Sequence, residues 1–486
     1  MPLKIYNTIA KDKEEFRPFK EGEVSIYVCG PTVYDFLHVG NFRGPVFFNL
    51  VRNWLEFRGF KVKYVSNFTD IDDKILQRSL KENVDSLIIS ERFIEEYKTD
   101  FRTLGLRAHD ANPKVTENLD EIVSMTEKLI ENGKAYVVDG EVLYAVRSFE
   151  GYGKLSKRDV DDMRTGTRVQ AGEKKRDVLD FSLWKPGKPG EKTWPSPWGP
   201  GHPGWAIECS AMIKAIFGDS IDIHGGGMDL VFPHHENEIA QSEGASGKPF
   251  VKYWMHWNMI NLGGLKMSKS VGNIRSARDF LNEFNAEIYK FMILSVHYRS
   301  LSDFSEAGID RAVSGLARVY SALANADRVV ESGSGVVPGK ASATQLGSME
   351  QSAEKLAAAL DDDFNTSEAF AEIFNVVRVY NSSVKPGKPN SEAVENAKAF
   401  SAWVRKWGKL FSLLQEDAQK FLTRLDDMLL KKKGIERAAI DEKVKARWSA
   451  RQAKDFAASD RLRDELLGLG IAISDTSDGT RWEVAK

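Results

Sequence analysis

The sequence predicts an α/β protein that begins with a Rossmann-like parallel-sheet domain carrying an insertion. A helical bundle and a small C-terminal domain follow. A buried strand at 24–29, a helix at 46–57 and an alternating strand at 61–65 form a βαβ unit, which favours a parallel sheet. From about 104 to 203 this alternation stops, and the segment ends in a run rich in Pro, Gly and Trp. After residue 270 the apolar spacing becomes helical.

The chain of 486 residues is longer than one hydrophobic core usually holds, so several domains are expected. Composition and periodicity set their bounds. We expect a Rossmann-like domain over 1–320, with the insertion at about 104–203 and a glycine-flanked loop at 263–273. The remainder divides into a helix end and linker at 321–345, a helical bundle at 346–425 and a small C-terminal unit at 426–486.

The composition limits the location and the partners of the protein. A net charge of −2 gives no global attraction to nucleic acid, so any RNA-binding surface must be a local patch. No apolar run approaches the roughly 20 residues of a membrane span, and no signal peptide is evident. We therefore expect a cytoplasmic protein without membrane contact, and a monomer, because no interface heptads are visible. In a reducing compartment, Cys29 and Cys209 are expected to ligate a metal or to be buried rather than to form a disulfide.

A polar segment follows the second predicted strand of the sheet. Gly30-Pro31 ends the first strand, and the polar segment Asn67–Asp73 follows the second. Ligands of parallel sheets bind at the C-terminal ends of the strands, so this segment is expected to face one. Farther along, Ile221–His224 predicts another strand and Gly225–Gly227 predicts a turn.

Two short motifs could meet around one triphosphate. His38-Val39-Gly40-Asn41 follows the first strand, and Lys266-Met267-Ser268-Lys269-Ser270 lies in the glycine-flanked loop. Two lysines on a mobile loop can neutralise phosphate charge, while a helix start approaches from the other side. The alternatives are an ordinary strand-to-helix turn with a capping His, and a solvated basic loop.

The histidines predict a metal centre. Five of the eight lie between His202 and His256. Phe232–Glu238 is expected to open a helix, so that His234 and Glu238 share one face and, with the two cysteines, could form a tetrahedral zinc site. The alternatives are buried cysteines that act as small hydrophobes and a surface His–Glu pair.

The second half of the chain is predicted to be mostly helical. Asp363-Phe364-Asn365-Thr366 predicts a helix N-cap before a helix at 368–380. Near the end, Lys431-Lys432-Lys433 and later basic residues alternate with acidic ones, so a solvated helix is the alternative to an RNA-binding surface. Two strand patterns at 470–474 and 480–484 predict a hairpin.

Several longer blocks, taken together with the two short motifs, closely resemble the signatures of cysteinyl-tRNA synthetases, which are class I aminoacyl-tRNA synthetases. The resemblance runs nearly end to end, over Cys29–Asp35, Thr69–Lys74, Gly204–Ser210, His224–Glu238, Ala359–Thr366 and Ala453–Leu466. It implies cysteine activation by ATP, release of pyrophosphate, and transfer of cysteine to tRNA(Cys). It also implies that residues 426–486 recognise the anticodon.

The resemblance also implies which side chains bind the ion and the substrates. It assigns one zinc ion per chain to Cys29, Cys209, His234 and Glu238, in the amino-acid pocket. Substrate cysteine would then contact Thr69 and Trp205, although a core position for Trp205 is an equal alternative. ATP would arrive with Mg²⁺, with its phosphates near His38, Gly40, Asn41, Lys266 and Lys269. Its adenosine would lie near Gly226, Gly227 and Asp229, although the two glycines could alternatively serve only a tight turn.

The sequence departs from the family pattern at one place, and two other functions remain possible. The family usually has Asn-Gly where this chain has Trp257-Asn258, so no adenine contact is assigned there. One rival is a cysteine ligase that couples the adenylate to an amino-sugar. The other is a non-catalytic, synthetase-like RNA-binding protein.

Overall fold

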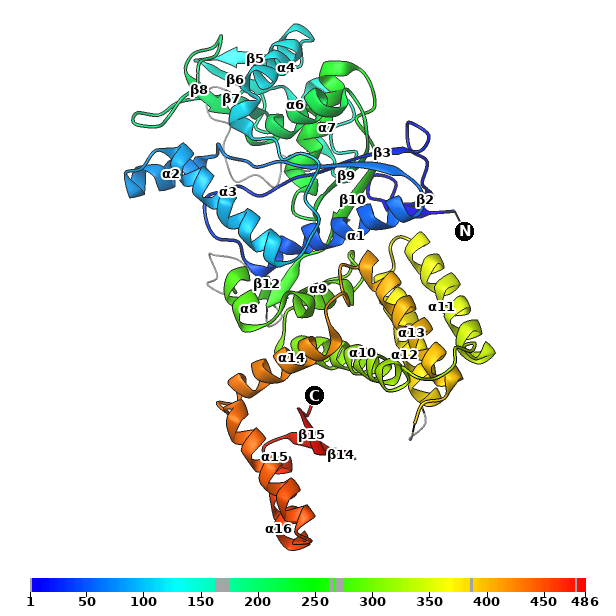
Figure 1. The fold of residues 1–486 in the computed structure, drawn as a ribbon. Helices are drawn as coiled ribbons and strands as arrows, with labels where there is room; N and C mark the ends of the chain where they lie inside the picture. Colours follow the sequence, from blue (N-terminus) through cyan, green and yellow to red (C-terminus); the bar gives the residue numbers. More distant parts are fainter. Residues whose placement is uncertain (1, 162–174, 263–264, 267–273, 385–387, 477–478) are drawn as a thin grey trace. The chain divides into compact units, whose positions relative to one another are not determined.

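The computed structural model describes residues 2–161, 175–262, 265–266, 274–384, 388–476 and 479–486. The chain forms two compact units (Figure 1). The first comprises Met1–Phe280, Ile293–Phe304 and Leu356–Ala369, and the second comprises Leu281–Met292, Ser305–Lys355 and Phe370–Lys486. No helix in the described part of the chain combines the length and the apolar composition needed to cross a bilayer.

The first unit is built on a four-stranded parallel sheet, which confirms the predicted fold class. Its strands are β3 (Glu23–Val28), β4 (Lys61–Ser66), β9 (Ile221–Gly227) and β10 (Val251–Trp257), in the order β10-β9-β3-β4. The crossover from β3 to β4 is the helix α1 (Arg43–Phe57), so the predicted βαβ unit is confirmed.

Helices cover both faces of this sheet (Figure 1). On one face, Tyr27 and Ile221 share an apolar cluster with Ile213 of α6 (Trp205–Phe217) and Ile239 of α7 (Glu236–Ser246). On the other face, the Phe48 ring of α1 packs against the sheet. These contacts bury apolar area on both faces of the sheet, as a parallel sheet requires.

The C-terminal ends of the four strands meet at one edge, and the predicted site residues follow them. Cys29 comes directly after β3, Asn67–Thr69 after β4, and Asn258 after β10. Since β4 and β9 flank β3 on opposite sides, the chain reverses its direction of winding beside β3. Ligands of open α/β sheets bind at such a reversal.

The predicted turn at Gly225–Gly227 is wrong, because all three glycines belong to strand β9. Their small size serves close packing instead. A Cβ on Gly225 would lie 2.2 Å from Cζ of Phe48, and one on Gly226 would lie 2.4 Å from Cε1 of His235. Phe48 is distant in sequence and His235 lies beyond the end of the strand, so the glycine run alone could not distinguish a turn from a tightly packed strand.

The predicted insertion contains a second, antiparallel sheet with its own helix. Its strands are paired in the order β5-β6-β7-β8, and its helix α4 packs against α6. Between β4 and the end of the insertion, the α-helices and strands in the described residues are α2 (Asp73–Glu82), α3 (Ser86–Thr103), α4 (Leu119–Glu131), β5 (Ala135–Val138), β6 (Glu141–Tyr144), β7 (Phe181–Pro186) and β8 (Gly201–Pro203).

Short elements complete the first unit. β1 and β2 form an antiparallel hairpin, while β11 pairs with β12 and β13. Their bounds, with those of the helices α8 and α9 near the division between the units, are β1 (Lys4–Asn7), β2 (Asp12–Glu15), β11 (Ile260–Leu262), β12 (Leu265–Lys266), β13 (Ser302–Asp303), α8 (Ala277–Glu283) and α9 (Ala286–Leu294).

The second unit is mostly helical, as predicted. Helices α10, α13 and α14 pack together, and a C-terminal apolar cluster joins Leu430, Ile440 and Val484. The predicted hairpin is confirmed by antiparallel β14 and β15. The remaining helices and strands are α10 (Glu306–Ser332), α11 (Ala343–Asp361), α12 (Thr366–Ser383), α13 (Ser391–Leu410), α14 (Ala418–Lys432), α15 (Arg437–Gln452), α16 (Phe456–Gly468), β14 (Ile471–Thr476) and β15 (Gly479–Val484).

The domain bounds at 320 and 426 remain predictions. Residue 320 lies inside α10 and residue 426 inside α14, so neither bound falls in a loop. The predicted N-cap is confirmed, since α12 begins at Thr366 and Asn365 Oδ1 accepts a hydrogen bond from the Glu368 amide.

Candidate metal centre and nucleotide pocket

The four side chains expected to hold zinc converge beside the C-terminal end of β3. The Cys29 sulfur lies 3.6 Å from Cys209 Sγ, 3.4 Å from His234 Nε2 and 3.5 Å from Glu238 Oε1. His234 Nε2 lies 3.0 Å from Glu238 Oε1, and all four donor atoms lie within 4.8 Å of one another. Tetrahedral zinc with nitrogen, oxygen and sulfur ligands separates its donors by about 3.3–3.8 Å. The three distances from the Cys29 sulfur match this range, and the His234–Glu238 pair would separate by a few tenths of an ångström around the ion.

Four separate segments deliver these donors. Cys29 follows β3, Cys209 lies in the second turn of α6, and Glu238 lies in the first turn of α7. The segment Phe232–Glu238 leads into a helix as expected, but the backbone of Phe232 is extended and the regular α-helix begins only at Glu236. His234 therefore precedes α7, yet its ring still reaches the carboxylate of Glu238.

The four side chains of this cluster shift one another's pKa values in different directions. A hydrogen bond from Cys29 is the main reason that the pKa of the Cys209 thiol falls to about 6, whereas burial raises the pKa of Cys29 well above its usual value. Burial opposes the charging of His234, but Glu238 and Cys209 outweigh it and raise the pKa of His234 to about 10. Against the same burial, His224 and His234 lower the pKa of Glu238 to about 2. Cys209 and Glu238 are therefore favoured as anions, and a metal ion bound by all four side chains would displace the protons of Cys29 and His234.

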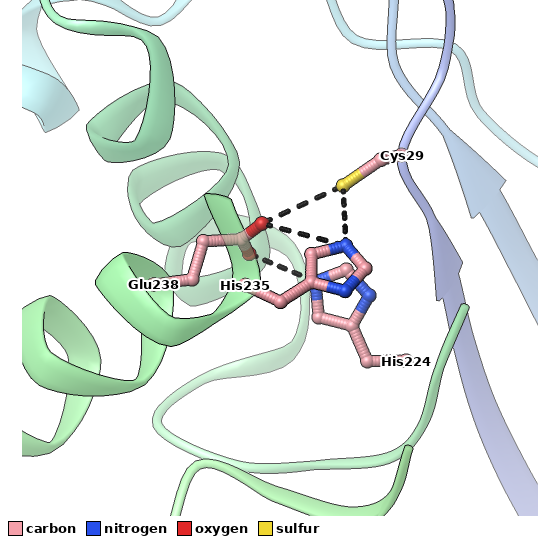
Figure 2. Close-up of side chains that lie close together, drawn as sticks. All are labelled: Cys29, His224, His235 and Glu238. Carbon is pink, nitrogen blue, oxygen red and sulfur yellow. Dashed lines mark hydrogen bonds and ion pairs between the residues drawn. The ribbon is translucent and has the colours of Figure 1, made fainter. Parts of the chain in front are cut away.

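Three further histidines, to which the sequence analysis gave no role, lie next to the candidate ligands and contact them or one another. His224 Nε2 lies 2.8 Å from Glu238 Oε2, and His235 Nε2 lies 3.4 Å from the Cys29 sulfur (Figure 2). His235 Nδ1 contacts His256 Nε2 at 2.8 Å, and burial is the main cause that lowers the pKa of His256 to about 3. Imidazoles bonded to ligand atoms fix the orientation of those ligands.

These histidines also offer a second grouping of donors. Cys29, His224, His235 and Glu238 lie within 4.8 Å of one another and are drawn in Figure 2. This grouping shares two members with the predicted set but replaces Cys209 and His234. The clustering of histidines between 202 and 256 was the available sequence signal, and it did not say which of them would ligate.

The cluster of candidate metal ligands adjoins a cavity of about 650 Å³. Cys29, Cys209 and His234 contribute to its wall. Trp205 also lines it, with its ring centroid 4.3 Å from that of His234 and 43% of its surface exposed, so a core position for Trp205 is wrong. The other predicted site residues that line the cavity are Thr69, His38, Gly40, Asn41, Gly227 and Asp229.

Thr69 is held at the cavity by two buried partners. Its hydroxyl donates to Glu208 Oε2 at 3.2 Å and accepts from Asn67 Nδ2 at 3.2 Å. Burial raises the pKa of the Glu208 carboxyl well above its usual range. A hydroxyl oxygen has two acceptor sites, so Thr69 retains one for a ligand donor.

The predicted strand-to-helix motif forms a capped turn before α1. The Gly40 amide donates to His38 Nδ1 at 3.1 Å, and the His38 amide donates to Asn41 Oδ1 at 2.9 Å. The capping role that the sequence left open is therefore confirmed. With Oδ1 of Asn41 engaged, its amide nitrogen supplies the donors for a ligand. The contact of this turn with phosphate stays a prediction.

The structure does not bring all the predicted nucleotide residues together. Gly226 packs against His235 instead of lining the cavity, whereas Gly227 and Asp229 do line it. The backbone of Lys266 pairs with Asn261 in the β11–β12 ladder. Lys269 lies outside the described residues.

The fold and this edge of the sheet match one class of enzyme. Residues 15–314 match the family model described as tRNA synthetases class I (C) catalytic domain, and residues 355–415 match the DALR domain. A solved Mycobacterium tuberculosis methionyl-tRNA synthetase in complex with methionyl-adenylate has the same fold, with a TM-score of 0.62, 13% identity and coverage of 82% of this chain and 93% of that one. The class is that of the class I aminoacyl-tRNA synthetases.

Relatives that match over the whole chain identify the family within this class. The cysteine–tRNA ligase of Bdellovibrio bacteriovorus is 57% identical over 100% of both chains. That of Syntrophotalea carbinolica is 44% identical over 99% of this chain and 100% of its own. The chain belongs to the cysteine–tRNA ligase family, which confirms the family predicted from the sequence.

Proposed function

We propose that the protein activates L-cysteine with ATP to give cysteinyl-adenylate and pyrophosphate, and then transfers cysteine to tRNA(Cys). The convergence of two thiols, an imidazole and a carboxylate beside the same cavity that the His38–Asn41 turn enters is the observation that carries this proposal. Relatives that share the full length of the chain and are named cysteine–tRNA ligase support it.

The first part of the proposal concerns selection of the substrate thiol. Cysteine and serine differ by one atom, and a pocket discriminates weakly between such close analogues by shape alone. A zinc ion held by Cys29, Cys209, His234 and Glu238 would supply a soft Lewis acid that favours a thiolate over a hydroxyl. Around it, His224 and His235 orient the carboxylate and the thiol that form the cluster.

The remaining groups of the amino acid can be held by neighbouring side chains. The free acceptor site of Thr69 suits the substrate ammonium, since its other bonds to Glu208 and Asn67 fix the hydroxyl. Trp205 covers the His234 side of the cavity and can exclude water from the bound substrate.

The chemistry at phosphorus needs positioning rather than a side-chain nucleophile. The substrate carboxylate attacks the α-phosphate, and pyrophosphate leaves; Mg²⁺ bound to ATP would neutralise part of the phosphate charge. The Asn41 amide nitrogen and His38 line the approach to the phosphates, and Lys266 and Lys269 neutralise the charge that develops there. Gly227 and Asp229 border the adenosine end.

For tRNA binding, we assign whole domains rather than individual residues. We assign the bundle at 346–425 and the unit at 426–486 to tRNA, the latter to the anticodon, because base-specific RNA recognition uses unstacked loop bases. Arg447 is excluded from this role, since it is buried and its guanidinium binds Asp475 at 2.7 and 3.0 Å. We place the enzyme in the cytoplasm as a monomer.

Aminoacylation with total tRNA tests the whole proposal. The protein, ATP and labelled cysteine should give cysteinyl-tRNA, whereas serine should give none above background. Cysteine-dependent pyrophosphate exchange without transfer to tRNA, but with transfer to an amino-sugar, would favour the rival ligase. Absence of exchange would favour a non-catalytic protein.

Replacing Lys269 with alanine should slow adenylate formation by at least about tenfold, equivalent to about 1.4 kcal/mol of transition-state stabilisation. The ammonium would be lost from the developing charge on the phosphates, while the affinity for cysteine should change little. Pyrophosphate exchange at varied cysteine and ATP measures both effects. Lys248→Ala removes an exposed lysine that pairs with Asp219 and serves as the matched control. An unchanged exchange rate in Lys269→Ala would reject the assignment.

A further inference from the structure

We propose that Trp257 forms the wall against which the adenine of ATP packs, and that Arg43 and Gly44 of α1 position its indole. The inference rests on the proposed function and adds a nucleotide-facing residue to it. It concerns the point at which the sequence departs from its family.

The indole of Trp257 is seated between α1 and β9. Trp257 ends β10 opposite Gly227, and its carbonyl accepts from the Met228 amide at 2.9 Å. A Cβ on Gly44 would lie 2.4 Å from both Cζ2 and Cη2 of the indole, and one on Gly227 would lie 3.7 Å from its Nε1. The Phe48 ring meets the indole edge-on, with centroids 5.9 Å apart. Gly44 therefore makes room for the indole, Gly227 is in ordinary contact with it, and the side chain also lines the cavity.

Arg43 fixes the backbone that follows Trp257. Its Nη1 donates to the carbonyls of Asn258 and Met259, each at 2.8 Å. Its Nη2 donates to the carbonyls of Ser300 at 2.8 Å and His297 at 3.3 Å. Only 1% of Arg43 is exposed, so these bonds lie in a low-dielectric interior, where they are strong and costly to break. One guanidinium thus ties residues 258–259 to the turn at 297–300.

The position of Trp257 fits a purine base. In the order β10-β9-β3, the end of β10 lies two strands from the end of β3, a distance of about 10 Å. Cysteine held at Cys29 would therefore leave room for the rest of an adenylate to extend toward Trp257. The His38–Asn41 turn is continuous with Arg43 and Gly44 through Phe42, so one stretch of chain places both the phosphate turn and the indole. An aromatic face packs well on a planar base.

The test separates the Michaelis constant for ATP from that for cysteine in pyrophosphate exchange. Trp257→Ala should raise the ATP constant about tenfold through lost stacking, and Trp257→Phe should recover most of it. Gly44→Ala should raise it to a similar extent, because the new Cβ displaces the indole. Arg43→Lys should raise the ATP constant at least threefold, because an ammonium has three donors and no planar fork and so holds the backbone after Trp257 less firmly. The constant for cysteine should stay within about twofold in all four variants, as the thiol is held elsewhere.

A double variant distinguishes displacement of the indole from a general loss of folding or activity. Gly44→Ala should have no further effect in a Trp257→Ala background, since the clash partner is gone. Gly347→Ala is the matched control, because Gly347 lies within α11 and an added Cβ there meets nothing within 4 Å. Its kinetics should equal those of the unaltered enzyme.

Three results would overturn the inference: unchanged ATP constants in the single variants, parallel rises for cysteine, or additive effects in the double variant. An unchanged ATP constant in Arg43→Lys alone would overturn the positioning role of Arg43. If the unaltered protein shows no cysteine-dependent exchange, the proposed function itself fails, which is a different outcome.

Discussion

Cys209→Ser should lose its bound zinc and bind cysteine at least about a hundredfold more weakly. Even the loss of a group that only supports a ligand costs about 10–100-fold in metal affinity, and Cys209 is expected to be a ligand itself. The thiol of Cys209 has a pKa of about 6 and can supply a thiolate at neutral pH, which a serine hydroxyl cannot. Elemental analysis gives the zinc content, expected to fall from about one per chain, and pyrophosphate exchange gives the Michaelis constant for cysteine.

The control places the same hydroxyl in the same helix. Ala211 is buried in α6 two residues after Cys209, and Ala211→Ser should retain about one zinc per chain. The Michaelis constant for ATP should change little in either variant, because the nucleotide binds elsewhere in the cavity. A Cys209→Ser protein with full zinc and normal cysteine affinity would contradict the assignment of this ligand.

Asp363→Ala should lower the free energy of unfolding by about 3 kcal/mol, as expected when one partner of a buried ion pair is removed. The Asp363 carboxylate is buried, accepting from the Tyr6 amide at 2.9 Å, the Tyr298 hydroxyl at 2.7 Å and Arg299 Nε at 2.7 Å. These bonds hold a turn in which Asp363 and Phe364 have φ of 59° and 52°. Such backbone is unfavourable for a bulky residue such as Phe, so it needs this support.

The neighbouring aspartate provides the matched control. Asp362 forms an ion pair with Lys13 at 2.7 Å, and its side chain is 52% exposed. Asp362→Ala should cost only about 0.2–1 kcal/mol, the usual range for an exposed pair. Urea denaturation followed by circular dichroism compares the two variants. Equal losses would mean that the Asp363 carboxylate does not hold this turn.

The sequence predicted the parts of the fold that depend on neighbouring residues. Strand, helix and strand over β3, α1 and β4 each show a local apolar period, and the βαβ unit followed from that period alone. The role of Gly225–Gly227 could not be found in this way. It depends on Phe48 and His235, which reach the glycines only in the folded chain.

The same limit applies to the metal cluster. His224, His235 and His256 come from β9, the segment before α7, and β10, and they meet only because these strands are adjacent in the sheet. Spacing along the chain gave His234 and Glu238 as a pair, and the two cysteines of the chain were its possible partners. The family resemblance then favoured this zinc site over buried cysteines and a surface His–Glu pair. The structure then brought all four donors within reach of one ion.

X-ray absorption spectroscopy of the zinc-loaded protein tests the central claim most directly. Without substrate, the zinc should have two sulfur neighbours at about 2.3 Å and two lighter neighbours at about 2.0–2.1 Å. With cysteine present, we predict a third sulfur neighbour, and with serine no change. A sulfur count of two in the presence of saturating cysteine would show that the ion does not hold the substrate thiol, and would contradict this account of selectivity.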